Sequence, residues 1–264
     1  RAIDHQRVIA QVDRLLDDGQ VVNLLLVLID HRNMVQVPFP DGFRCRDTSF
    51  DGFLRGLDEL GVRPDQIAGV MTETYQGGNA SFAPAEYMQD LRAWCDEHQV
   101  LLIFDEVQVG MGRTGTLFAH EQEDVVPDVM TLAKALGGGI PIGAMCTTRE
   151  LAASLVPGTH ASTFGGNPLA CAVAAAVFDE LLEGGVLDHA KSMGDRLGEG
   201  LESIAQAAGP DRVHETRGRG LLRRDPGAAG RGRRPAPKAT RAAAPRRGPA
   251  RARPPRRGPA PPLR

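Results

Sequence analysis

The stretch LLIFDEVQVGMGRTG, residues 101–115, decides how the fold is interpreted. The apolar run Val100–Phe104 predicts a strand that is buried on both faces. It delivers Asp105 to the C-terminal end of that strand, directly before a glycine-rich loop. Open α/β sheets bind ligands at such strand ends, so Asp105 is a candidate site residue. An aspartate that caps a helix at an ordinary strand–loop junction is the alternative interpretation.

Outward from this stretch, expected strands and helices alternate along the chain. Such alternation predicts an α/β fold with a mostly parallel sheet flanked by helices. We expect a loop at 33–47, which contains two prolines and a glycine, and a partial amphipathic helix at 1–20. The other expected strands are 21–29, 67–72, 129–132 and 142–147, and the expected helices are 49–60, 84–98, 149–155, 168–183 and 186–207.

Two further stretches suit a ligand that carries an aromatic ring and a phosphate. In DVMTLAKALGGGIPIG, residues 128–143, Lys134 follows a short apolar strand and lies among small residues, which leaves room for a ring beside its amine. In GTHASTFGGNPLA, residues 158–170, Ser162 and Thr163 offer hydroxyls, and two glycine amides follow before a helix. That arrangement suits a phosphate. Taken singly, a solvated lysine and a plain capped turn are the competing interpretations.

In combination, these stretches resemble the class III pyridoxal-phosphate-dependent aminotransferases. The sequence DEVQ, then AKALGGG with its lysine 29 positions after the aspartate, then STFGGNP follow the family's order. In pattern they are similar to acetylornithine, ornithine and 4-aminobutyrate aminotransferases, over roughly residues 35–222 and most densely over 67–170. The resemblance implies a type I pyridoxal-phosphate-dependent transferase fold, present as a fragment that is incomplete at both ends.

The resemblance also implies an organisation into parts. Residues 1–170 would be a partial large, cofactor-binding domain. Residues 171–222 would be a linking helix and the start of a small C-terminal domain. Residues 223–264, almost only Arg, Pro, Ala and Gly, lack the apolar side chains that offset ordering entropy, so we expect a disordered tail. An out-of-frame translation of GC-rich DNA is one hypothesis for its origin.

Roles for individual residues follow from the resemblance. Lys134 would be the catalytic residue that binds pyridoxal 5'-phosphate covalently, and its freed amine would move the substrate proton. Asp105 would pair with the pyridinium nitrogen of the cofactor. Val107 would pack against the ring face, and Gln108 would reach the ring hydroxyl. All four residues belong to the stretches that carry the resemblance.

Two further pairs of residues receive implied roles. Thr163, with Ser162, would bind the cofactor phosphate of the partner subunit in a homodimer. In TETYQGGNASFAP, residues 72–84, Glu73 and Gln76 match the family segment often written EPIQGEGG and would contact substrate or shape the site. Gly78 stands where many members carry a glutamate, which leaves the identity of the substrate open.

The implied function is transamination of an amino acid or ω-amino compound, with 2-oxoglutarate as the acceptor. An aminomutase or decarboxylase of the same fold is an alternative, since fold does not fix chemistry. Because the chain lacks part of the family's phosphate cradle and its substrate-binding arginine, we expect weak activity or none. The widely spaced cysteines favour a cytoplasmic setting and predict neither disulfides nor a metal site.

Charge is distributed unevenly along the chain. From Arg217 to Arg264 there are 16 Lys/Arg and one acid, although the whole chain has a net charge of −2. Such a tail could bind nucleic-acid phosphates without sequence preference, which is a competing, non-catalytic function. The tail has no aromatic residue for base stacking, and the acidic remainder opposes approach, so we do not expect nucleic acid as a partner. No apolar run is long enough for a membrane helix.

Overall fold

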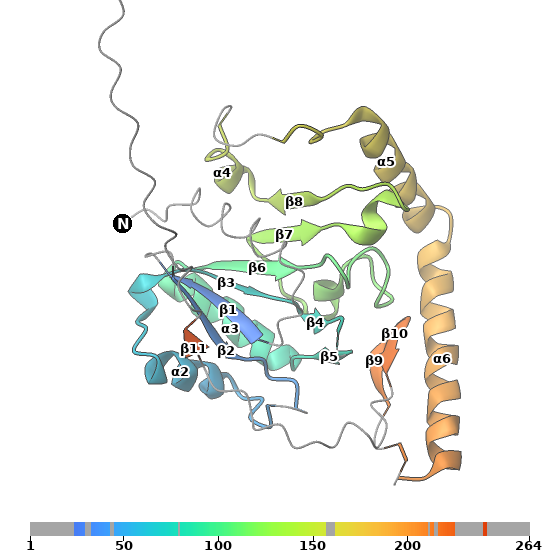
Figure 1. The fold of residues 1–264 in the computed structure, drawn as a ribbon, viewed down its shortest axis with the longest axis horizontal. Coiled ribbons are helices and arrows are strands. Elements are labelled where there is room, and N and C mark those ends of the chain that lie inside the picture. Colours follow the sequence, from blue (N-terminus) through green and yellow to red (C-terminus); the bar gives the residue numbers. More distant parts are fainter. Residues whose placement is uncertain are drawn as a thin grey trace, which may run out of the picture.

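The central feature of the fold is a seven-stranded sheet within the part of the chain that the structure describes (Figure 1). The computed structural model describes residues 24–29, 33–42, 45–78, 80–156, 162–210, 212–213, 216–224 and 240–241. The expected helix at 1–20 and the first residues of the expected strand at 21–29 lie outside these ranges. The strand order is β11-β2-β1-β3-β6-β7-β8. Its strands are β1 (Leu24–Ile29), β2 (Asn33–Pro38), β3 (Ile67–Thr72), β6 (Leu101–Asp105), β7 (Val129–Leu132), β8 (Ala144–Thr147) and β11 (Thr240–Arg241).

The centre of the sheet is parallel, as the alternation of strands and helices predicts. β3 pairs with β6 and β6 with β7 in parallel register, with Thr72 opposite Phe104 and Asp105 opposite Thr131. The outer strands β1, β2, β8 and β11 are joined by antiparallel pairings. Because β3, β6 and β7 run the same way, their C-terminal ends meet at one edge. That edge carries the candidate site.

The expected loop at 33–47 is wrong in its first part. Residues Asn33–Pro38 form β2, which pairs with β1 along its whole length. Val35 and Val37 are fully buried, so the alternating apolar residues of NMVQVP override the influence of the following prolines. Pro38 ends the strand and therefore removes no donor from its interior.

Both faces of the sheet are covered, which explains the continuous apolar strands. On one face, Leu102 and Phe104 of β6 pack with α2 (Phe50–Glu59) and α3 (Ala85–His98) in the largest core cluster. On the other face, Leu101 and Ile103 pack with Leu151 of α4 (Arg149–Ala152). Successive side chains of a strand point to opposite faces, so a strand buried on both must be apolar throughout.

The two long C-terminal helices have the expected bounds to within a few residues. α5 (Pro168–Leu182) begins with a proline, and the Asn167 side chain accepts a hydrogen bond from Ala170 N. α6 (Val186–Ala208) runs along one side of the molecule, beside the hairpin of β9 (Arg217–Arg219) and β10 (Leu222–Arg224) (Figure 1). No helix among the described residues combines the length and apolar character that crossing a membrane requires.

The tail departs from expectation at four residues. We expected disorder from residue 223, but Arg223 and Arg224 belong to β10, and Thr240 and Arg241 form β11 on the edge of β2. Backbone pairing with an open sheet edge needs no apolar side chain, which explains how such a composition forms a strand. The remaining tail residues lie outside the described ranges.

Candidate active site

Asp105 is the last residue of β6, at the sheet edge where the parallel strands end. Its Oδ1 accepts a hydrogen bond from Val107 N at 2.9 Å, which fixes the carboxylate over the turn that follows the strand. Burial raises the pKa of Asp105 above its ordinary value, while the Val107 N–H and the nearby Lys134 ammonium lower it. Asp105 is therefore a half-buried carboxylate that gains from a cationic partner.

Lys134 follows the next parallel strand, β7, and begins the short 3-10 helix η3 (Lys134–Gly137). Its Nζ lies 3.5 Å from Oε1 of Gln108, a residue that comes 26 positions earlier in the chain. The Lys134 side chain is exposed, so the amine is accessible to a reactant. Its backbone has φ of +45°, the left-handed region that non-glycine residues rarely adopt. Such backbone strain is found most often at functional sites.

Glu73 reaches the same place from the end of the third parallel strand, β3. Its Oε2 accepts a hydrogen bond from Gly77 N at 3.0 Å. The pKa of Glu73 is raised to about 7, chiefly by burial and also by the Asp105 carboxylate, although the Gly77 N–H and the Lys134 ammonium lower it. The charges of Glu73, Asp105 and Lys134 therefore influence one another.

Gly77 brings the Glu73 turn against the Gln108 side chain. A Cβ on Gly77 would lie 2.2 Å from Cδ of Gln108, which no packed structure tolerates. The absence of a side chain at Gly77 thus lets Gln108 lie where it contacts Lys134. Gln76, just before the glycine, is buried in the short strand β4 (Tyr75–Gln76), which pairs with β5 (Ser81–Phe82).

The structure unites some of the predicted site residues and leaves two apart. Glu73, Asp105, Gln108 and Lys134 form one cluster, which we call the strand-end cluster, and Val107 donates to Asp105 at its margin. Ser162 and Thr163 lie in an exposed turn before α5. Within the described part of the chain, no hydrogen bond joins either of them to the strand-end cluster. Their predicted role across a subunit interface stays a prediction.

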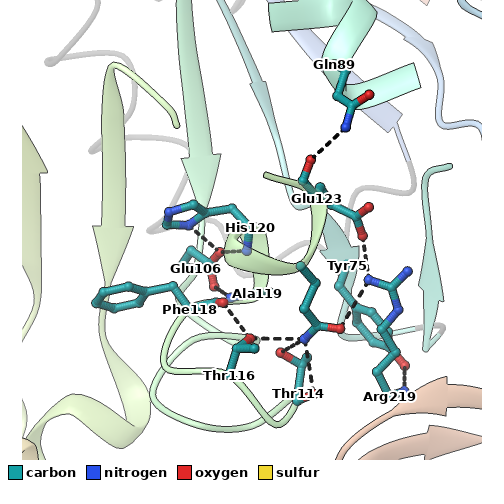
Figure 2. A network of polar contacts seen from close by, with 11 residues as sticks. Tyr75, Gln89, Glu106, Thr114, Thr116, Phe118, Ala119, His120, Glu123 and Arg219 are labelled. Atoms are coloured by element: carbon teal, nitrogen blue, oxygen red, sulfur yellow. Dashed lines mark hydrogen bonds and ion pairs between the residues drawn. The ribbon is translucent and has the colours of Figure 1, made fainter. Parts of the chain in front are cut away.

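Sequence reasoning assigned no role to Glu106, although it lies within DEVQ. Its side chain is fully buried, and its two oxygens accept hydrogen bonds from the backbone N–H groups of Ala119 and His120, each at 2.9 Å (Figure 2). His120 Nδ1 lies 3.1 Å from the same carboxylate. Glu106 therefore ties the end of β6 to the start of the 3-10 helix η2 (Ala119–Glu123). The sequence feature that could have indicated this role is a carboxylate directly after a buried apolar strand.

Sequence reasoning also missed a connection between η2 and the hairpin of β9 and β10. The guanidinium of Arg219 forms an ion pair with the buried Glu123 and a hydrogen bond of 3.2 Å with Gln122 Oε1 (Figure 2). It also lies over the Phe82 ring, 4.1 Å from the centroid. The Tyr75 hydroxyl accepts from Arg219 N and donates to Leu222 O. These contacts fasten the hairpin to the body that carries the cluster.

The architecture is that of the type I pyridoxal-phosphate-dependent transferases, in part. The solved ornithine aminotransferase of Toxoplasma gondii, described as having partial occupancy of pyridoxal phosphate at its active site, is 35% identical with a TM-score of 0.60, over 67% of this chain and 40% of that chain. N-acetylornithine aminotransferase of Stenotrophomonas maltophilia is 38% identical with a TM-score of 0.55, over 67% of this chain and 44% of that chain.

The sequence comparisons identify the family. The family model described as aminotransferase class-III matches residues 27–224, and the chain belongs to this family of pyridoxal-phosphate-dependent enzymes. Acetylornithine aminotransferase 1 of Bradyrhizobium diazoefficiens is 53% identical over 60% of this chain and 39% of its own length. Acetylornithine aminotransferase of Agrobacterium fabrum is 47% identical over 71% of this chain and 47% of its own length. The chain thus spans less than half the length of these relatives.

Proposed function

We propose that this chain carries the cofactor-binding core of an aminotransferase, with Lys134 as the residue that holds pyridoxal phosphate. The observation that carries the proposal is the strand-end cluster. An accessible lysine amine and a half-buried carboxylate, Asp105, lie at neighbouring strand ends and interact electrostatically. The neighbouring Gln108 adds an amide that contacts the amine.

The chemistry of these residues fits the cofactor. Its aldehyde needs a primary amine, its ring nitrogen a carboxylate and its ring hydroxyl a hydrogen-bonding partner, and Lys134, Asp105 and Gln108 supply one each. When bound, pyridoxal phosphate supplies a ring that accepts an electron pair from the substrate. Burial makes Asp105 a better partner for a cation than an exposed aspartate would be.

The residues of the cluster divide the remaining work. Lys134 Nζ, once free, would accept the proton that leaves the substrate Cα and, as an ammonium, would hold it for return to the bound reactant. Gln108 orients that amine through its Oε1. Glu73, whose pKa burial raises to about 7, is partly protonated at neutral pH and keeps the Gly77 turn in place. These roles require only that the three side chains lie close to the reactant, and they need no further catalytic group.

The names of the relatives support an N-acetylornithine-type amino donor, and 2-oxoglutarate is the acceptor that we propose with it. Two curated proteins at 53% and 47% identity are acetylornithine aminotransferases, and a solved structure at 38% identity is an N-acetylornithine aminotransferase. Gly78 is exposed at the turn that follows β4.

A homodimer is part of the proposal. Ser162 and Thr163 would reach the phosphate of a partner's cofactor, and the apolar side chains next to them support burial of this surface. Phe164 is 82% exposed and Leu169 is 68% exposed. Changing Phe164 and Leu169 to aspartate should then yield monomers in sedimentation analysis. Val126→Asp is the control, because Val126 lies in another part of the chain and is 75% exposed, and this variant should not yield monomers. A wild-type chain that sediments as a monomer contradicts the proposed homodimer.

Two assays test the central proposal. Adding pyridoxal phosphate to the purified chain should produce the absorbance band of an aldehyde condensed with an amine, and Lys134→Ala should abolish it. Lys191→Arg, at an exposed lysine of α6, is the control and should retain the band. Glutamate formation from 2-oxoglutarate is then compared with N-acetylornithine, ornithine and 4-aminobutyrate as donors. An unchanged band in Lys134→Ala overturns the proposal, and a preference for another donor overturns the substrate.

A further inference from the structure

Glu106 is a buried carboxylate whose charge the architecture of its loop does not explain. Its side chain has 0% exposure. Its oxygens accept from Ala119 N and His120 N, and His120 Nδ1 is the third neighbour (Figure 2). Among the described residues, no lysine or arginine pairs with it. Removing an ionised carboxylate from water costs several kcal/mol, only part of which backbone donors recover.

The charge of Glu106 does act on the strand-end cluster. Glu106 directly follows Asp105, and its carboxylate raises the pKa of Asp105, against the lowering effect of Lys134. It also raises the pKa of Glu73, to which burial contributes most. The groups that face Asp105 are thus two acids, Glu73 and Glu106, and one ammonium, Lys134. This excess of acids favours a ligand that brings a positive charge to Asp105.

We propose that Glu106 is a positioning residue of the cofactor site, whose buried negative charge acts through Asp105 to strengthen its hold on a protonated ring nitrogen. The inference rests on the proposed function, because it takes a pyridinium as the ligand. The amides of residues 119 and 120 keep the Glu106 carboxylate fixed, at the position directly after Asp105. Since charge acts over distance in a poorly solvated site, Glu106 needs no contact with the ligand.

The test compares two buried carboxylates of the same polar network. Glu106→Gln removes the charge beside Asp105. Glu123→Gln is the matched control, because Glu123 is 2% exposed but pairs with Arg219 on the hairpin side. Both variants should lower thermal stability. Only Glu106→Gln should weaken binding of pyridoxal phosphate, by about tenfold for charges screened as at a protein surface. Equilibrium dialysis of the full chain measures this dissociation constant.

A second readout needs no cofactor and reports on Asp105 directly. Carboxyl-labelled aspartate, with Asp105 assigned through Asp105→Asn, allows its pKa to be followed by carbon NMR. Because the Glu106 charge raises the pKa of Asp105, Glu106→Gln should lower it, and Glu123→Gln should leave it unchanged. A purely structural role for Glu106 would not produce this difference.

The conservative variant separates charge from architecture. Glu106→Asp keeps the charge but shortens the reach to the two amides, so its cofactor affinity should stay within about threefold of wild type. If Glu106→Gln does not fold, this variant alone decides, and a tenfold loss overturns the inference. Equal effects of Glu106→Gln and Glu123→Gln on both readouts also overturn it. If the wild-type chain does not bind the cofactor, the proposed function fails instead, while the NMR comparison still judges the influence of Glu106 on Asp105.

Discussion

The hydroxyl of Tyr75 donates a hydrogen bond of 2.6 Å to the carbonyl of Leu222, 147 residues further along the chain. The same oxygen accepts from Arg219 N at 3.1 Å. The Tyr75 side chain of β4 thus forms a hydrogen bond with each of the two strands, β9 and β10, of the hairpin that follows α6. Because β4 also carries the turn between Glu73 and Gly77, the hairpin is fastened directly beside the strand-end cluster.

Replacing Tyr75 by phenylalanine should destabilise the chain by about 1–3 kcal/mol, because two partly buried backbone groups lose their hydrogen-bond partner. The ring remains and keeps its stacking on Phe82, with centroids 5.9 Å apart. Tyr87→Phe is the control, since the buried Tyr87 hydroxyl has no hydrogen-bond partner among the described residues. Urea unfolding measures the loss of stability in both variants. Equal losses in the two variants would refute the role of the Tyr75 hydroxyl.

Glu73 should make stability depend on pH. Its pKa rises from 4.5 to about 7 on folding, chiefly through burial, so the folded chain holds this proton to higher pH than the unfolded chain. Ionisation therefore opposes folding: stability falls as pH rises from about 4.5 to about 7, by roughly 3 kcal/mol, and the penalty persists above that range.

Glu73→Gln tests this pH dependence, because a glutamine can still accept from Gly77 N. The free energy of unfolding of the variant minus that of wild type should increase between pH 5 and 7.5, in unfolding curves recorded at several pH values. Taking this difference cancels the contributions of groups that do not interact with Glu73. A difference that stays constant with pH would show that Glu73 has its ordinary pKa.

Gly77→Ala should affect the site more than the fold. The new Cβ would collide with the end of the Gln108 side chain, which is flexible and can move away at a cost below about 1 kcal/mol. Moving it separates Gln108 from Lys134. We expect pyridoxal phosphate to bind several-fold more weakly, as measured by dialysis. Gly200→Ala in α6, where a Cβ meets nothing, should leave binding unchanged. Unaltered affinity in Gly77→Ala would remove Gln108 from the site.

Lys134 should be held in a strained backbone conformation. At φ of +45°, glycine is favoured over residues with a Cβ by about 1–2 kcal/mol, reduced by the greater freedom of glycine in the unfolded chain. Lys134→Gly should therefore be more stable than Lys134→Ala by about 1 kcal/mol in thermal or urea unfolding. Both variants lose the same exposed side chain, so the comparison isolates the backbone. An alanine variant that is as stable as the glycine variant would contradict the strain.

The sequence predicted the parts of the fold that depend on local patterns. The apolar run before Asp105 and the proline at the start of α5 gave a strand and a helix close to those observed. β2 was missed because its alternating burial is visible only once its partner β1 is known. The strand β11 was missed for the same reason, since pairing at a sheet edge is a tertiary property.

The positions of the candidate site residues were predictable where the chemistry lies in a single side chain at a strand end. Asp105, Gln108 and Lys134 meet because parallel strands end at one edge, which the alternation of elements implies. Glu106 was not predictable in the same way, because its partners are backbone amides in a segment 13 and 14 residues away. The amino-acid sequence does not show which backbone N–H groups of a loop point toward the protein interior.

The most direct test of the central claim is borohydride reduction of the chain with pyridoxal phosphate, followed by mass mapping of the modified peptide. The chain has three lysines, Lys134, Lys191 and Lys238, so each outcome is unambiguous. The account predicts a single stoichiometric adduct on Lys134, which is lost in Lys134→Arg. An adduct that is shared evenly among the three lysines, or that persists at full yield in Lys134→Arg, would contradict it.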